Sequence, residues 1–227
     1  MKKICIILAC LLAAVLPAAA ETVVVEAGRD ATLIEDPDGA RANGSGPYLF
    51  AGRTSQQQNG IRRGLVYFDV AAVLPRHAII ESVELRLTHS GGNSPQRSVQ
   101  LHRMQADWNE GPAYASGGGG APSGFGDTTW LHTFYDATRW VRPGGHYVRR
   151  ASASQDVGPG GRYAWASTVH LVQDVRLWLA APQRNFGWML IGDESTPQNA
   201  KRIASRENPD PTIRPRLEIH YRLPSLD

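Results

Sequence analysis

The stretch "SVELRLTH", residues 82–89, alternates apolar and polar side chains at every step. In an extended chain, Val83, Leu85 and Leu87 lie on one side and the intervening polar residues lie on the other. Alternation with a period of two predicts a half-buried β-strand, with one face toward a core and the other toward solvent.

The same pattern recurs near the end of the chain, where "PRLEIHY", residues 215–221, places Leu217, Ile219 and Tyr221 on one face. Shorter candidate strands occupy residues 21–27, 31–36, 47–52, 63–70, 98–104, 162–167, 186–193 and 202–207. The 23 glycines and 15 prolines are spread between these runs as turn residues. Many short strands separated by turns predict an all-β fold, an antiparallel β-sandwich resembling a jelly roll.

One segment, "STVHLVQDVRLWLAAP" at residues 167–182, has helical periodicity instead. Leu171, Val175, Trp178 and Leu179 recur at the spacing of a single helix face. Ser167 or Thr168 is suited to the N-cap, and Pro182 follows the expected end. We therefore expect one short amphipathic helix against the sandwich.

Residues 1–20 have the features of a secretory signal peptide. Lys2 and Lys3 precede an apolar run, and three alanines end at Ala20, which predicts cleavage before Glu21 and one domain over residues 21–227. Acylation of Cys10 as a lipoprotein is the alternative, although it leaves a very short apolar core. The protein is thus expected to be secreted, either extracellular or periplasmic, with no membrane insertion after cleavage.

The expected mature chain has no cysteine, because Cys5 and Cys10 both lie in the signal peptide, so neither disulfides nor thiolate chemistry is expected. Loss of Lys2 and Lys3 lowers the formal net charge from +3 to +1 and leaves one lysine, Lys201. Proteins that bind nucleic acid need clustered positive charge, so a nucleic-acid partner is not expected.

Read in order, several segments resemble a known family. "LFAGRT" (49–54) is followed by a phenylalanine-aspartate strand end in "VYFDV" (66–70), and "ADWNEG" (106–111) supplies a Trp-x-Glu turn. The helix, the Phe-Gly strand and the final "SRENPDPTIRPRLEIHY" (205–221) complete the series. Over residues 28–222 this succession resembles the DNRLRE domain, also described as the family 96 carbohydrate-binding module.

That resemblance implies a secreted β-sandwich. Some members of the family bind polysaccharide, and the anionic polymer alginate is one such ligand. We expect a non-catalytic module that binds polysaccharide or a cell-surface glycan, possibly acidic. One alternative is a structural protein of the extracellular matrix or envelope that associates with other proteins, which a large apolar patch without a sugar-width groove would favour. A second is a polysaccharide lyase or hydrolase, which needs converging acid and base groups in a cleft.

Aromatic residues near the glycine-rich segment 110–127 are candidates for a sugar-binding platform, because the C–H faces of pyranose rings pack on aromatic rings. This segment is expected to be a loop. Trp140, Tyr114, Phe125 and Tyr135 are the predicted ligand-binding aromatics. The other tryptophans are predicted to be structural, in the core or at loop ends: Trp108, Trp130, Trp165, Trp178 and Trp188.

Arginines near Trp140 are the second group of candidates. Arg139, Arg142 and Arg149, with the adjacent Arg150, would suit an acidic sugar, because a guanidinium binds a carboxylate in a planar two-point geometry. The alternative is that arginine simply occupies solvated faces in this lysine-poor chain.

Other reactive groups give weaker signals. Asp107 and Glu110 flank Trp108, but isolated acids of this kind are expected to be turn caps or arginine partners, and no catalytic residue is predicted. The seven histidines show no zinc-ligand spacing, so neither a metal site nor a cofactor is predicted. "EDPDG" (35–39) leaves calcium open, although it lacks a full set of oxygen ligands and suits an ordinary turn.

The stretch "SREN", residues 205–208, sits between two predicted strands. We expect a structural role in which a partly buried Arg206 holds a carboxylate, with Asp69 at the end of "VYFDV" as the predicted partner.

Overall fold

A computed structural model describes residues 20–92 and 94–224 of the chain. Apart from Ala20, the predicted signal peptide lies outside these residues, as do Cys5 and Cys10.

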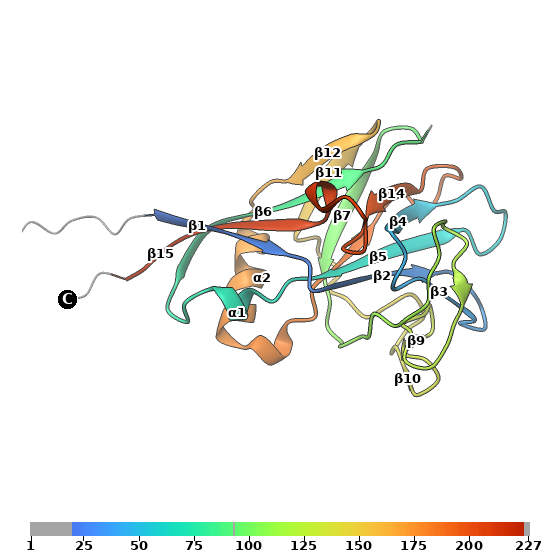
Figure 1. Ribbon diagram of the computed structural model, residues 1–227, viewed down its shortest axis with the longest axis horizontal. Coiled ribbons are helices and arrows are strands. Elements are labelled where there is room, and N and C mark those ends of the chain that lie inside the picture. Colours follow the sequence, from blue (N-terminus) through green and yellow to red (C-terminus); the bar gives the residue numbers. More distant parts are fainter. Residues whose placement is uncertain (1–19, 93, 225–227) are drawn as a thin grey trace, which may run out of the picture.

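The predicted fold class is confirmed: the described residues form an antiparallel β-sandwich (Figure 1). Eleven of their strands belong to one continuous sheet that folds over on itself, and we name its two halves sheet A and sheet B. Sheet A consists of β1 (Ala20–Glu26), β15 (Arg216–Arg222), β6 (Ile79–His89), β14 (Lys201–Ala204) and β12 (Gly161–Trp165). Sheet B consists of β2 (Arg29–Ile34), β5 (Ile61–Tyr67), β13 (Trp188–Ile191), β7 (Arg97–Arg103) and β11 (Ala153–Val157).

One strand belongs to both halves. The first four residues of β4 (Tyr48–Arg53) pair with β14, and its last two pair with β5. Gly52, at this change of partner, has a φ of +117°, which favours glycine. The sheet therefore turns from A to B within a single strand.

Shorter elements occupy the connections. Two small ladders pair β3 (Arg41–Ala42) with β8 (Ala121–Pro122) and β9 (His132–Phe134) with β10 (Thr138–Arg139). The helices are α1 (Val70–Val73) and α2 (Val169–Ala180), with 3₁₀ turns η1 (Pro182–Arg184) and η2 (Pro211–Ile213). The sequence pattern did not predict the one-turn helix α1.

The strand and helix faces read from the sequence are confirmed. Leu85 of β6 and Leu217 of β15 are buried and directly opposite each other in the ladder. In α2, the hydroxyl of Thr168 accepts the Leu171 N–H at 3.0 Å, as an N-cap does. Trp178 on the predicted apolar face is fully buried.

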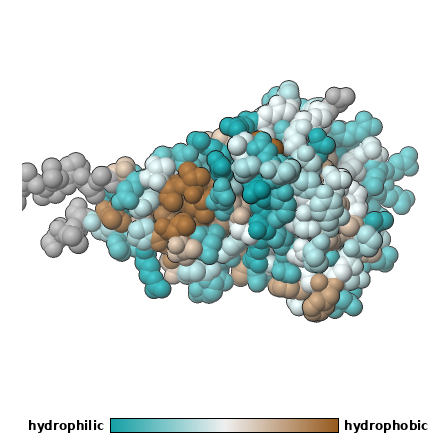
Figure 2. Space-filling view, in the orientation of Figure 1, coloured by the Kyte–Doolittle hydropathy of each residue, from teal (hydrophilic) through white to brown (hydrophobic). Residues whose placement is uncertain are grey.

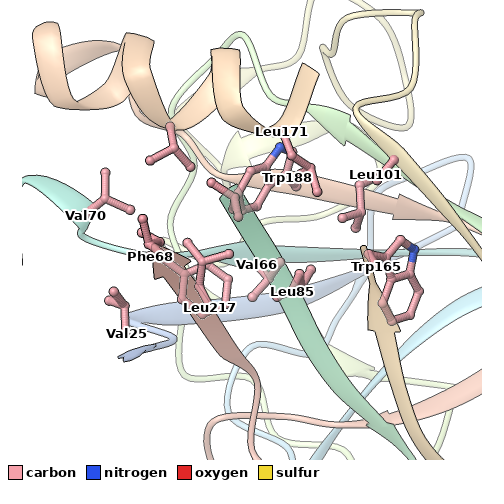
Figure 3. Packing of buried hydrophobic residues seen from close by; sticks show 14 of the residues in the cluster. Val25, Val66, Phe68, Val70, Leu85, Leu101, Trp165, Leu171, Trp188 and Leu217 are labelled. Carbon is pink, nitrogen blue, oxygen red and sulfur yellow. The ribbon is translucent and has the colours of Figure 1, made fainter. Parts of the chain in front are cut away.

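The main core lies between sheets A and B and extends under α2 (Figure 3). Trp165, Trp178 and Trp188 belong to this core, as predicted, and Trp178 and Trp188 lie 4.4 Å apart between ring centroids.

A third layer covers the other face of sheet B. Leu33, Leu65 and Met189 point away from the main core and pack against Trp108 and Trp140, which come from the long segment between β7 and β11. This segment carries β9 and β10 and lies below β2 and β5 in Figure 1. The outer layer is therefore built from irregular chain rather than from a further sheet.

The glycine-rich loop has a defined path within this arrangement. Its Gly118 carbonyl accepts the Nε–H of Arg62, a residue only 1% exposed whose remaining donors are directed at Asn59, Ile61 and Gln56. Burial lowers the pKa of Arg62 to about 10. Within residues 20–92 and 94–224, no helix is long and apolar enough to cross a membrane.

Candidate functional site

The turn at residues 141–145 builds one wall of a basic pocket on the outer layer. The N–H of Gly144 donates to the Trp130 carbonyl at 2.7 Å. Gly144 has a φ of +81°, and a Cβ atom there would lie 2.6 Å from Nη1 of Arg63 and 2.8 Å from the Trp130 ring. Only glycine fits this position, so "RPGGHY" fixes the turn that displays Arg142.

The chain then runs back along β7. Met104 and Tyr147 form an antiparallel bridge, and the N–H of Gln105 donates to the His146 carbonyl at 2.9 Å. Together these segments enclose a pocket of about 460 Å³. We call it the basic pocket, and its polar lining consists of Arg63, Gln105, Arg142, His146, Tyr147 and Arg149.

Arg63 is the fixed part of this site. Its Nε and Nη2 donate to the two oxygens of Glu194 at 2.6 and 3.0 Å, and its Nη1 donates to the Gly144 carbonyl at 2.7 Å. Its guanidinium carbon also lies 4.9 Å from the centroid of the Trp130 ring. Burial alone would lower the pKa of Arg63, but the hydrogen bonds and charge of Glu194 outweigh burial and raise it. Arg63 is thus neutralised and holds the pocket wall.

Arg142 and Arg149 are the free positive charges of this site. Both side chains are exposed, and within the described residues neither forms an ion pair or a side-chain hydrogen bond. Val141, 76% exposed, adds an apolar surface beside them. The half-buried Tyr147 has its ring 5.2 Å from that of His102. Two free guanidinium groups, an amide and an apolar surface can together hold a carboxylate and one face of a sugar ring.

The structure brings together two of the seven predicted ligand-binding residues, Arg142 and Arg149. Arg139 is exposed on β10, and Tyr135 is half-buried with its ring edge against His132 at 5.1 Å. Tyr114 and Phe125 are exposed, at 62% and 87%, but they lie on the glycine-rich loop and are not part of the pocket lining.

The prediction of Trp140 as a sugar platform is wrong. Its side chain is only 6% exposed, packs in the cluster beneath the outer layer, and donates its Nε1–H to the Thr129 carbonyl at 2.9 Å. A buried ring offers no face to a ligand. The structural roles predicted for Trp108 and Trp130 agree with their contacts: Trp108 is fully buried and donates to the Phe186 carbonyl, and Trp130 packs on Arg63.

Sequence reasoning missed Arg63, Gln105, His146 and Tyr147. The "GGHY" part of the pocket stood next to the predicted arginines and could have been included on proximity alone. No sequence signal connects Arg63 and Glu194 to it, because they are separated by 131 residues.

The acids flanking Trp108 are arginine partners, as expected. Asp107 pairs with Arg29 at 2.7 Å, and Glu110 pairs with Arg206 at 2.8 Å. In the "EDPDG" segment, Asp36 Oδ1 accepts the N–H groups of Asp38 and Ala40, both at 3.0 Å, which is turn chemistry.

Arg206 is partly buried and holds carboxylates, but the predicted partner Asp69 is wrong. Asp69 instead accepts the Ala72 N–H and caps α1. Nη1 of Arg206 lies between Glu110 and Glu207, at 2.8 and 2.7 Å, and its backbone N–H donates to Asp30 at 2.7 Å. Asp69 sits at the start of its own helix, which uses its carboxylate locally.

We call Asp30, Glu110, Glu207 and Arg206 the acid cluster. The three carboxylates have oxygen atoms within 4.8 Å of one another, with one guanidinium between them. Burial, followed by the charge of Glu110, raises the pKa of Glu207 to about 7. Burial also raises the pKa of Asp30 and of Glu110. Beside the acid cluster, the Ser205 hydroxyl donates to the Gly46 carbonyl and the Asn208 side-chain amide donates to the Pro47 carbonyl. These two hydrogen bonds connect the segment "SREN" after β14 to the loop before β4.

No family model matches the chain, and no curated protein matches it. The resemblance to the DNRLRE domain therefore stays a prediction. What the fold and the pocket define is an antiparallel β-sandwich with a basic pocket on its outer layer.

Proposed function

We propose that the protein is a secreted, non-catalytic module that binds an acidic polysaccharide in the basic pocket. The observation that carries this proposal is the pair of exposed arginines, Arg142 and Arg149, which have no ion-pair partner among the described residues and line one pocket. Guanidinium groups without a partner are suited to the carboxylates of a polymer built from uronic acids.

Pocket shape and composition support the same proposal. A volume of about 460 Å³ falls in the range of small-ligand sites, roughly 300–1,000 Å³. No aspartate or glutamate is among the described residues that line it. A hydrolase of the two-carboxylate type would need such a pair across the cleft, so the pocket favours binding over that chemistry.

Affinity electrophoresis tests this function. The purified protein runs in native gels containing polygalacturonate or alginate, with a neutral β-glucan as reference, each with calcium and with chelator. We expect retardation by the acidic polymers only, weakened by salt because the attraction is electrostatic.

The double variant Arg142→Ala/Arg149→Ala is expected to lose most of this retardation. Its matched control is Arg76→Ala/Arg184→Ala, which removes two exposed arginines that do not line the pocket. Equal retardation of the two double variants, or none for the wild-type protein, would contradict the proposal.

A structural role in a matrix or envelope is the second candidate, and an apolar patch favours it. Figure 2 shows this patch over β1 and α1, where Val24 and Val73 are 52% and 46% exposed. Exposed apolar patches of this kind mark association surfaces. Sedimentation velocity tests it: self-association that Val24→Asp abolishes would support this candidate, and a concentration-independent monomer would remove it.

A further inference from the structure

A second groove rich in arginine lies on the outer face of sheet A. In β6 and β15 the residues between the core positions point outward, which places Arg216 directly opposite Arg86. On the other side of β6, Arg162 of β12 is opposite Thr88. The segment after η2 contributes Arg214. We call this feature the arginine groove, and its volume is about 400 Å³. The charged residues described in its lining are Arg86, Arg162, Arg214, Arg216 and the acid Glu84.

The arginines of this groove are unequally neutralised. Arg86 is held by Glu84 at 2.7 Å and Glu218 at 3.0 Å, whereas Arg216 has only a 3.6 Å contact with Glu26. Within the described residues, Arg162 and Arg214 form no ion pair and donate only to backbone carbonyls.

Asp210 is an acid close to Arg162 and Arg214. Its pKa is lowered, first by the hydrogen bond from the Thr212 N–H and also by the charges of Arg162 and Arg214. Because this carboxylate caps η2, it is engaged with the backbone and leaves guanidinium donors of the groove available.

Arg162 and Arg214 are the part of the groove suited to an anionic oxygen. Arg162 donates through Nη2 to the Thr212 carbonyl, and Arg214 donates through Nε to the Asn208 carbonyl. Each guanidinium therefore keeps further N–H donors, which can bind a carboxylate in a planar two-point geometry.

The two basic sites face away from each other across the sandwich. Inner residues of sheet A, such as Leu85 and Leu217, share the main core with Val66 and Leu190 of sheet B. The arginine groove is on the outer side of sheet A, and the basic pocket is on the layer that covers the outer side of sheet B. A polymer strand in one site therefore leaves the other site open.

We propose that the arginine groove is a second site for an acidic polysaccharide, so that one chain binds two polymer strands and cross-links them. This inference rests on the proposed function of the basic pocket. Two sites on one rigid body raise the avidity for a long polymer without any new contact within either site.

Cross-linking is measured as turbidity when the protein is mixed with long polygalacturonate. The wild-type protein and the control Arg76→Ala/Arg184→Ala are expected to produce turbidity. Arg162→Ala/Arg214→Ala, which spares the basic pocket, is expected to abolish turbidity yet retain retardation in polygalacturonate gels. Arg142→Ala/Arg149→Ala should also abolish turbidity and keep only the weak retardation that the arginine groove provides, and the quadruple variant should show neither property. Thermal melting of each variant checks that it is folded.

The failure of this inference is distinguishable from the failure of the proposed function. If Arg162→Ala/Arg214→Ala matches the wild-type protein in turbidity and retardation, the second site is wrong and the basic pocket stands. If Arg142→Ala/Arg149→Ala alone abolishes all binding, only one site exists. Absence of any retardation of the wild-type protein overturns both proposals.

Discussion

Arg63 and Glu194 form a two-point ion pair, at 2.6 and 3.0 Å, that joins β5 to the loop after β13. The same guanidinium donates to the Gly144 carbonyl, so the pair also fixes the turn that carries Arg142. The shape of the basic pocket therefore depends on a contact between residues far apart in the sequence.

Glu194→Gln tests that dependence. The side chains of Arg63 and Glu194 are 13% and 23% exposed, so loss of the carboxylate leaves a poorly solvated positive charge. We expect the free energy of unfolding to fall by about 2 kcal/mol in urea titrations. Glu81→Gln is the control, because its pair with Arg222 is 42% exposed on both sides and should contribute under about 1 kcal/mol. Equal effects of the two changes would contradict the structural role of Glu194.

Arg206→Ala is expected to destabilise the protein by about 1–2 kcal/mol while leaving polysaccharide binding by the folded fraction intact. A double-mutant cycle identifies its partner. We expect a coupling energy of about 1 kcal/mol with Glu110→Gln and none, within about 0.3 kcal/mol, with Asp69→Ala. Coupling to Asp69 would contradict the cluster described above, and unchanged melting with lost binding would make Arg206 a ligand-binding residue.

The acid cluster makes stability depend on pH. Because the pKa of Glu207 rises from 4.5 to about 7 on folding, the folded state binds the extra proton in this window. Its contribution is fully present below pH 4.5 and is lost as pH rises toward 7, by up to about 3 kcal/mol. Asp30 and Glu110, whose pKa values are also raised, act in the same direction.

Three buried histidines oppose this trend, because burial lowers the pKa of His89, His102 and His132. The informative quantity is therefore the difference in unfolding free energy between the wild-type protein and Glu207→Gln. We expect this difference to shift against the wild-type protein between pH 4.5 and 7. A difference that does not vary with pH would show that Glu207 is not protonated in the folded state.

Trp140→Ala is expected to lower the free energy of unfolding by about 3–5 kcal/mol, because it leaves a cavity where the buried ring packs and removes the hydrogen bond from Nε1 to the Thr129 carbonyl. Trp140→Phe should cost less, and its folded fraction should bind polysaccharide as the wild-type protein does. Unchanged thermal melting of Trp140→Ala combined with lost polysaccharide binding would contradict the structural role of Trp140 and would support a direct contact between its ring and the sugar.

The regular parts of this fold were predictable from the sequence, and the outer layer was not. Alternation in "SVELRLTH" identified Leu85 as a core residue, and helical spacing identified Trp178, because strand and helix periods are local properties. Trp140 lies in irregular chain without a period, so its burial against Leu33 and Met189 depends on the path of the whole segment.

The same limit applies to the site. Arg142 and Arg149 were found because they are close to Trp140 in the sequence. Arg63 belongs to β5 of sheet B, and only the folding of the chain brings it to the pocket. Arg206 was expected to hold a carboxylate, but its partner Glu110 is 96 residues away and no local pattern distinguishes it from Asp69.

The most direct test of the central claim is protection of individual arginines from phenylglyoxal, measured by mass spectrometry with and without polygalacturonate. We predict that the polymer protects Arg142 and Arg149 but leaves the exposed Arg76 and Arg184 as reactive as before. Equal modification of Arg142 and Arg149 in the presence and absence of bound polymer would contradict the assignment of the basic pocket as the binding site.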